Sequence, residues 1–233
     1  MSMTEIPEPD GLAPRPPLSP SQEDYLKQIF LLGDGVESVS TRDLSRRLDV
    51  RPASVTGMIQ RLAEQGLVSH EPYHGVRLTD GGRRVALEML RHHRLLETYL
   101  KQVLGYSWEE VHEEAERLEH VISERFEARI AEAMGHPTHD PHGDPIPDAD
   151  LRMPPARTEI NLTALGAGRT ATLIRVGTQD RRSLTRLGRL GLIPGAEIAV
   201  VETGGDEIRV EVNDNRHRLP QELARELWLR EEQ

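Results

Sequence analysis

The stretch RPASVTGMIQRLAEQGLVSHEPYHGVRLT, residues 51–79, carries two patterns that together predict the fold. Apolar residues recur every three or four positions in its first half, which predicts a helix over about 52–65 that stops at Gly66. Two short extended runs lie on either side of His74-Gly75 in its second half, and they predict a β-hairpin. A helix followed directly by a hairpin is typical of the second half of a winged helix.

Two further helices are predicted upstream of this stretch. The pair Ser19-Pro20 suits the start of one helix, and Ser40 or Thr41 suits the cap of a second, shorter one. Five elements therefore occur in the order helix, helix, helix, strand, strand. Residues 19–84 are predicted to form a winged helix-turn-helix domain that binds DNA.

The helix over about 52–65 is the predicted DNA-reading element of such a domain. Its N-terminal end has small side chains that permit close approach to base edges, and it offers arginine and amide donors for phosphates. The predicted DNA-contacting residues are Arg51, Ala53, Ser54, Thr56, Gly57, Gln60, Arg61 and, from the hairpin, Arg77. The alternative is that these are ordinary solvent-facing residues of a three-helix bundle; the adjoining helix and hairpin favour DNA binding.

Length and composition exclude several classes of protein. The chain has 233 residues, 36% of them hydrophobic and 29% charged, and no run is apolar enough to span a bilayer. Residues 1–20 have neither the basic nor the apolar region of a secretory signal. Because the chain has no cysteine, any metal must be held by histidine, carboxylate or carbonyl ligands. A cytoplasmic protein that does not enter a membrane is expected.

The formal net charge of −10 is distributed unevenly along the chain. Residues 40–84 contain eight Arg against five Asp and Glu, a balance of +3. Residues 85–150 contain six Lys and Arg against fifteen Asp and Glu, a balance of −9, together with seven of the ten histidines. A basic module followed by an acidic, histidine-rich one predicts phosphate contact in the first and cation binding in the second.

The acidic region is predicted to contain two long helices, over about 81–104 and about 107–134. The second helix carries four potential metal ligands on one face, beside an apolar stripe: His112, Glu116, Glu119 and His120. The first helix carries His93 and Glu97, four residues apart. Imidazole and carboxylate donors suit Mn, Fe(II), Co, Ni or Zn, and the surplus of oxygen favours the harder ions. A solvated face of two Glu-rich helices is the alternative.

Prolines mark the boundaries of the predicted domains. Six of the sixteen lie in the first 20 residues, which predicts a disordered Pro-rich arm over 1–18, and six more lie between positions 137 and 155. The second group predicts an extended proline-rich segment, followed by a linker at 151–160. Four potential ligands in the proline-rich segment are explained more simply by turn chemistry than by metal binding: His136, His139, His142 and Asp144. Short alternating runs and Gly-rich turns then predict a small β domain over 161–233.

The chain as a whole resembles the diphtheria-toxin-repressor and manganese-transport-regulator family of metal-dependent repressors. The segments that carry the likeness in residues 19–150 are SQEDYLKQIFLL, RPASVTGMIQRLAEQGLV, RHHRLLE, VHEEAERLEHVISE and HGDPIP. Further on, RLGRLGLIPGAEIAVVE is similar to the SH3-like (FeoA-like) domain of the longer members. The resemblance implies a fold that is mainly α with β. It would comprise an N-terminal winged helix-turn-helix, a helical dimerisation and metal-binding domain at 85–150, and a C-terminal SH3-like small β-barrel.

The resemblance also implies two metal sites. The primary site would use Asp24, Glu116, Glu119 and His120, and the second would use His93, Glu97 and His112. Iron-responsive members have sulfur ligands where this chain has carboxylates at positions 24 and 116, so the replacement favours Mn(II), with Fe(II) as the alternative.

This chain departs from the family pattern at two places. Lys27 stands where the manganese branch has a carboxylate, which argues against the two-metal cluster of that branch. The ligands that the SH3-like domain donates in iron-type members align near Arg175 and Thr178, where Gln179 or Asp180 could substitute.

The function that the resemblance implies is a homodimer that represses metal-uptake genes when loaded with Mn(II). Its partner would be a pseudo-palindromic operator in double-stranded DNA. One alternative is a winged-helix regulator that answers a small organic ligand. A metalloenzyme is disfavoured because the chain has no HExxH motif, nucleophile elbow or phosphate loop, so the protein is not expected to be an enzyme.

Overall fold

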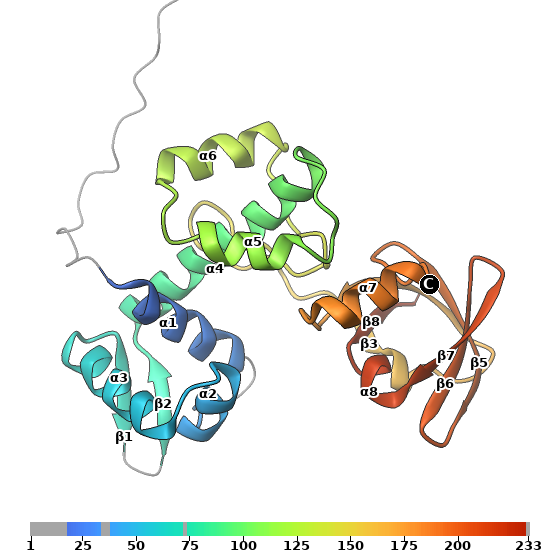
Figure 1. Ribbon diagram of the computed structural model, residues 1–233, viewed down its shortest axis with the longest axis horizontal. Helices are drawn as coiled ribbons and strands as arrows, with labels where there is room; N and C mark the ends of the chain where they lie inside the picture. The colour runs from blue at the N-terminus through green and yellow to red at the C-terminus, as the bar shows by residue number, and fades with distance from the viewer. Residues whose placement is uncertain (1–17, 34–37, 72–73, 232–233) are drawn as a thin grey trace, which may run out of the picture.

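The computed structural model describes residues 18–33, 38–71 and 74–231. They form a winged-helix unit, a helical unit and a β-rich unit, at the lower left, the top and the right of Figure 1. The predicted arm over 1–18 lies outside the described residues except for Leu18. Among the described helices, none is both long and apolar enough to cross a membrane.

The winged-helix unit confirms the order of elements predicted from the sequence. Its elements are α1 (Pro20–Leu32), α2 (Thr41–Arg47), α3 (Pro52–Glu64), β1 (Val68–Glu71) and β2 (Gly75–Leu78). Ser19 and Gln22 form a capping box at the start of α1, and the Ser40 hydroxyl accepts a hydrogen bond from the Asp43 backbone N–H at the start of α2. Buried leucine, isoleucine and valine side chains from all three helices fill the space between them and the hairpin.

Helix α4 (Asp80–Gln102) connects the winged-helix unit to the helical unit (Figure 1). Fifteen of its 23 residues are buried, which is far more than one face of a helix, because its two halves pack against different neighbours. The N-terminal half contacts α1 and the hairpin, while the C-terminal half contacts the helical unit. At its start the backbone is very close to the bend between α3 and β1: a Cβ on Gly82 would lie 1.9 Å from the Leu67 carbonyl oxygen.

The single helix predicted over about 107–134 is wrong, because the structure divides it into two. Helix α5 (Val111–Leu118) and helix α6 (Glu124–Ala133) are separated by a turn at residues 119–123. Ser123 caps α6 by accepting a hydrogen bond from the Phe126 backbone N–H, so a local capping signal overrides the continuous apolar stripe. The break leaves Glu119 and His120 at the very end of α5.

The proline-rich segment after α6 folds back onto α4. Two buried arginines of α4 hold its backbone: Arg91 Nη1 donates to the Pro147 carbonyl at 2.6 Å, and Arg94 Nη1 donates to the Pro145 carbonyl. Between these two prolines, Ile146 is buried in the core of the helical unit. The segment is therefore part of the helical unit up to about residue 148.

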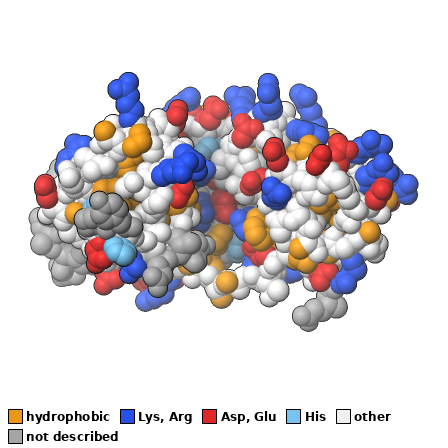
Figure 2. Space-filling model, turned by 90° about the horizontal axis from the view of Figure 1, so that it is seen from below, with side chains coloured by type: hydrophobic (Ala, Val, Ile, Leu, Met, Phe, Trp, Pro, Cys, Tyr) orange, Lys and Arg blue, Asp and Glu red, His pale blue; other side chains and the backbone are white. Residues whose placement is uncertain are grey.

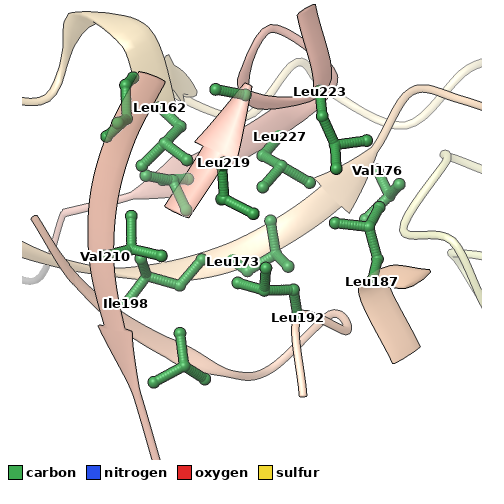
Figure 3. Close-up of a cluster of buried hydrophobic side chains, with 14 of the residues drawn as sticks. Leu162, Leu173, Val176, Leu187, Leu192, Ile198, Val210, Leu219, Leu223 and Leu227 are labelled. Atoms are coloured by element: carbon green, nitrogen blue, oxygen red, sulfur yellow. The ribbon is translucent and has the colours of Figure 1, made fainter. Parts of the chain in front are cut away.

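The β-rich unit contains one antiparallel sheet with strand order β3-β8-β4-β5-β6-β7. The elements are β3 (Ile160–Asn161), the 3-10 turn η1 (Leu162–Ala164), β4 (Thr170–Val176), α7 (Arg181–Arg189), β5 (Glu197–Gly204), β6 (Glu207–Val212), β7 (Asn215–Pro220), α8 (Gln221–Ala224) and β8 (Leu227–Arg230). Its aliphatic core is drawn in Figure 3, where Leu173, Ile198 and Val210 point from three strands toward one another. This small sheet domain agrees with the SH3-like fold expected from the sequence.

One aromatic side chain joins the helical unit to the β-rich unit. Trp108 precedes α5, yet it is buried in the core of the β-rich unit, where a Cβ on Gly188 would lie 2.8 Å from its indole Nε1. The proline-rich segment makes a second connection, because the Val176 backbone N–H donates to the His142 carbonyl at 2.8 Å.

The close approach at Gly82 predicts a destabilised Gly82→Ala variant. A new methyl group would collide with the Leu67 carbonyl, and overpacking of this kind costs about 1–3 kcal/mol. The matched control is Gly81→Ala, whose Cβ would meet only ordinary contacts at 3.7 and 3.8 Å. Thermal unfolding should show a lower Tm for Gly82→Ala and little change for Gly81→Ala. Equal Tm values for the two variants would contradict this packing.

Candidate metal centre and DNA-contact surface

Potential metal ligands from three helices meet between the winged-helix unit and the helical unit. Helix α1 contributes Asp24, helix α4 contributes His93 and Glu97, and helix α5 with the turn after it contributes the remainder. The helical spacing of the sequence explains each local pair, whereas the packing of α1 and α5 against α4 brings the pairs together.

The first group consists of Asp24, Glu119 and His120. One ligand atom of each lies within 4.8 Å of the others, and His120 Nε2 is 3.1 Å from Asp24 Oδ1 and 3.5 Å from Glu119 Oε1. Asp24 Oδ1 is buried and accepts no hydrogen bond from any described residue. Burial raises the pKa of Asp24 above its ordinary value of 3.8. An unpartnered, buried carboxylate oxygen beside a histidine nitrogen is an arrangement that fits a cation.

The first group includes an orienting residue that the sequence analysis missed. His120 Nδ1 donates to Glu23 Oε2 at 2.7 Å, so its Nε2 is directed toward Asp24 and Glu119. A carboxylate that holds one imidazole nitrogen in this way fixes the tautomer needed for the other nitrogen to bind a metal. The sequence signal was weak, because Glu23 is simply the residue before Asp24.

The second group consists of His93, Glu97 and His112. Glu97 Oε1 lies 3.0 Å from His93 Nε2 and 3.1 Å from His112 Nδ1, and the two nitrogens are 3.0 Å apart. These three atoms would hold a divalent metal, because two imidazole nitrogens and one carboxylate oxygen are common metal ligands. All three predicted second-site residues therefore converge on one point.

Glu116 does not join the first group as the sequence analysis expected. Its Oε1 accepts from Lys27 Nζ at 2.9 Å, and the same ammonium lies 2.5 Å from Glu119 Oε1. Burial lowers the pKa of Lys27, but the carboxylates of Glu119 and Glu116 raise it further, and the result is above the ordinary value of 10.5. Glu116 instead belongs to a group with His93 and Glu119, on the side of the centre that faces α4.

The structure places a further histidine beside the second group, in a segment where Asp140 Oδ1 also accepts turn hydrogen bonds from the backbone N–H groups of His142 and Asp144. His142 is completely buried, its Nδ1 lies 3.5 Å from Glu97 Oε2, and neither atom has a hydrogen-bond partner among the described residues. The buried carboxylate of Asp140 completes a group with these two residues. In contrast, His136 is exposed and His139 contacts Arg157 at 2.9 Å, so these two are not drawn into the centre.

The residues of the β-rich unit that the sequence analysis considered as ligands belong to neither group. Arg175 pairs with Glu159 at 2.8 Å and stacks over Trp228, and Asp180 accepts from the Ser183 backbone N–H at the start of α7. The buried Gln179 Oε1 has no hydrogen-bond partner in the described part of the chain.

Buried charge perturbs the titration of the centre. Burial lowers the pKa of His93, but Glu97 and Glu119 outweigh it and raise that pKa to about 9. Burial raises the pKa of Glu119, yet His93 and Lys27 hold it below its ordinary value. In the absence of metal, the His93 imidazole is therefore a protonated partner of the buried carboxylates of Glu97 and Glu119.

The predicted DNA-contacting residues lie on the outer face of α3 and on the hairpin. Every one of them is exposed except Gly57, which is half-buried. A Cβ on Gly57 would meet nothing within 4 Å, so the absence of a side chain there serves no packing purpose within the protein. In a view of the whole molecule from below, basic and acidic side chains are interspersed over the described surface (Figure 2).

Three family profiles match successive parts of the chain. They are the iron dependent repressor N-terminal DNA binding domain at residues 17–76, the iron dependent repressor metal binding and dimerisation domain at 79–148, and the FeoA domain at 160–231. The chain is 34% identical over 215 residues to the iron-dependent repressor IdeR of Mycobacterium tuberculosis, covering 87% of this chain and 93% of that protein.

Solved structures give the same result. A manganese-dependent transcriptional repressor in complex with manganese is 39% identical, with a TM-score of 0.83, 90% of this chain covered and 99% of that chain. IdeR of T. acidophilum is 32% identical, with a TM-score of 0.74, 90% of this chain covered and 97% of that chain.

A winged helix joined through buried His and carboxylate groups to a helical unit defines a metal-dependent, DNA-binding regulator. The chain belongs to the diphtheria-toxin-repressor and manganese-transport-regulator family of transcriptional repressors. Members are repressors that bind operator DNA as dimers and are not enzymes, and the relatives include both manganese- and iron-dependent proteins.

The variant Gly57→Ala distinguishes an effect on protein stability from an effect on DNA binding. Alanine is favoured over glycine inside a helix by about 1 kcal/mol, so the variant should be more stable in thermal unfolding. If the backbone at Gly57 lies against the groove, the added methyl group should reduce operator affinity in a fluorescence anisotropy titration. Gly204→Ala, in the β-rich unit and equally open, is the control and should not affect DNA binding. Unchanged affinity in Gly57→Ala would remove this residue from the DNA interface.

Metal binding at the second group should release a proton. Free His93 is protonated below a pH of about 9, and it must lose that proton before its Nε2 can bind a metal. Metal affinity should therefore rise with pH, by up to about tenfold per unit, until the pH reaches that pKa. Calorimetric titrations in two buffers of different ionisation enthalpy measure the release. His93→Gln should release about one proton fewer, and identical release in both proteins would contradict the assignment.

Proposed function

We propose that this protein is a cytoplasmic, Mn(II)-responsive repressor of metal-uptake genes that reads a pseudo-palindromic operator as a homodimer. The observation that carries the proposal is the position of Asp24. It belongs to α1 of the winged-helix unit, yet its buried oxygen faces Glu119 and His120 of the helical unit. A metal at this point would be bound by both units at once.

The donor atoms of the first group support Mn(II). Two carboxylates and one imidazole, with no sulfur, form a set that suits a hard or borderline divalent ion. When bound, the metal supplies a positive charge that links these three side chains. Fe(II) is the second candidate, since the two imidazoles and one carboxylate of His93, His112 and Glu97 also suit that ion.

The metal would act by favouring one arrangement of the two units. Asp24 lies near the start of α1, which packs on α4, whereas Glu119 and His120 lie at the end of α5. An ion that binds more tightly when all three ligands converge shifts the population toward the docked arrangement. In a dimer, docking of both winged helices sets the spacing of the two α3 helices, and that spacing must match the half-sites of the operator.

The second group would connect metal binding to the β-rich unit. Glu97 faces His142, whose Nε2 contacts the Trp108 carbonyl at 2.9 Å, and the Trp108 side chain is buried in the β-rich core. A metal on His93, Glu97 and His112, with His142 alongside, would therefore stabilise the docking of the β-rich unit as well.

Asp24→Asn tests the proposed function. The amide keeps the shape of the side chain but removes the charge, so Mn(II) affinity at the first group should fall on the order of 100-fold. Metal-dependent binding to the protein's own promoter and to regions upstream of metal-transporter genes should fall with it. Binding is followed by anisotropy with Mn(II), Fe(II), Zn(II) and Co(II). The control is Glu113→Gln, an exposed carboxylate of α5 that lies 3.9 Å from Arg181 and belongs to neither group of potential ligands.

The outcomes distinguish the candidates. Selective activation by Mn(II) that Asp24→Asn abolishes supports the proposal, whereas selective activation by Fe(II) changes the metal and leaves the site in place. Tight DNA binding that ignores every metal, in both the wild type and the variant, would indicate a regulator that answers a small organic ligand.

A further inference from the structure

A buried lysine lies in the middle of the metal centre. The chain has 29 Lys and Arg residues, but only Lys27 and Lys101 are lysines. Lys101 is exposed at the end of α4, whereas Lys27 extends from α1 into the centre and is only 2% exposed. Since nearly every other basic side chain here is an arginine, the surroundings of Lys27 should explain why a lysine is present at this position.

The two carboxylate oxygens around Lys27 are placed to suit a compact ammonium group and not the flat guanidinium group of an arginine. Its Nζ lies 2.9 Å from Glu116 Oε1 and 2.5 Å from Glu119 Oε1. Glu116 belongs to α5, and Glu119 directly follows that helix. An ammonium is a compact charge with three donors, whereas a guanidinium is a flat fork that requires oxygens lying side by side. Glu116 and Glu119 also belong, with His93, to a group of potential metal ligands, so Lys27 occupies carboxylates that a second ion would need.

Lys27 already supplies a positive charge to the two carboxylates that a second ion would need. A second divalent ion would have to lie beside this ammonium, where Lys27 and Glu119 are almost completely buried, and the two like charges would repel each other. Uncompensated buried charge is strongly unfavourable.

We propose that Lys27 is a built-in cation that takes the place of a second metal, so that the first site binds one divalent ion only. The inference deepens the proposed function and rests on the metal site described there. Lys27 would determine the number of ions bound, and it would also compete with the metal for Glu119. The two can share this residue, since its carboxylate has two oxygens and about four lone-pair positions.

The position of Lys27 has a second consequence for the metal-free protein. Because the lysine belongs to α1 and its partners belong to α5 and the following turn, it ties the winged-helix unit to the helical unit before any metal arrives. The metal would then add Asp24 to a contact that already exists. Without Lys27, docking of the metal-free protein would rest on the Glu23–His120 hydrogen bond and on the packing of α1 against α4.

The test is a Mn(II) titration of the full chain, followed by electron paramagnetic resonance and by equilibrium dialysis with metal analysis. Lys27→Glu replaces the cation by a fourth carboxylate, so it should bind one more Mn(II) per protomer than the wild type. Two neighbouring Mn(II) ions should also give an exchange-coupled spectrum that the wild type lacks. Lys101→Glu makes the same charge change on the surface and should bind as many ions as the wild type.

Lys27→Gln keeps the test decisive if Lys27→Glu does not fold without metal. Removal of the competing ammonium should tighten Mn(II) binding at the first site at least about tenfold. It should also speed amide hydrogen exchange in α1 of the metal-free protein, and Mn(II) should restore protection.

Two outcomes would overturn the role of Lys27. They are an equal number of ions bound by the wild type and Lys27→Glu, and unchanged affinity and exchange in Lys27→Gln. A wild type that binds no Mn(II), or whose Mn(II) binding ignores Asp24→Asn, would instead refute the proposed site itself.

Discussion

The architecture of the centre depends on two carboxylates that are buried away from water, Glu97 and Glu119. A buried negative charge is stable only beside positive charge or strong hydrogen-bond donors. Here Lys27 comes from α1 and His93 from α4, while His112 and His142 come from α5 and the proline-rich segment. Because each partner belongs to a different part of the chain, neutralising the two carboxylates also positions those parts relative to one another. A metal bound at the proposed sites would strengthen an arrangement that these buried contacts already hold.

The same centre lies between the parts of the molecule that must act together. Helix α4 passes from the hairpin of the winged helix to the helical unit and carries His93 and Glu97 at its middle. On one side, Asp24 and Lys27 connect the centre to the DNA-binding unit; on the other, His142 and Trp108 connect it to the β-rich unit. Under the proposed function, a change of charge at this centre would act on contacts with both neighbouring units. Lys27 would be its permanent cation, and the metal a cation that comes and goes.

Much of the fold could be predicted because its signals are local. Each of these signals acts within one element and can therefore be recognised in the sequence. They are the caps at Ser19 and Ser40, the 3–4 periodicity of α3 and the alternation in β4 and β6. The predicted helix over about 107–134 failed for an instructive reason. Its apolar stripe continues through residue 122, but α5 ends at Leu118 and the cap at Ser123 starts a separate helix, α6. Periodicity indicates which face is buried, and it does not require the helix to be unbroken.

The sequence by itself determined the order of the elements of the winged helix, the absence of thiolate ligands from any metal site, and the placement of His93 and Glu97 one turn apart on one helix. These follow from composition and from the 3.6-residue repeat. Only the tertiary structure decided that Glu23 orients His120, that Lys27 separates Glu116 from the first group, and that His142 faces Glu97. The physical reason is distance along the chain. His120 and Glu23 are 97 residues apart, so no local pattern joins them, and their contact exists only because α1 and α5 pack on the same side of α4.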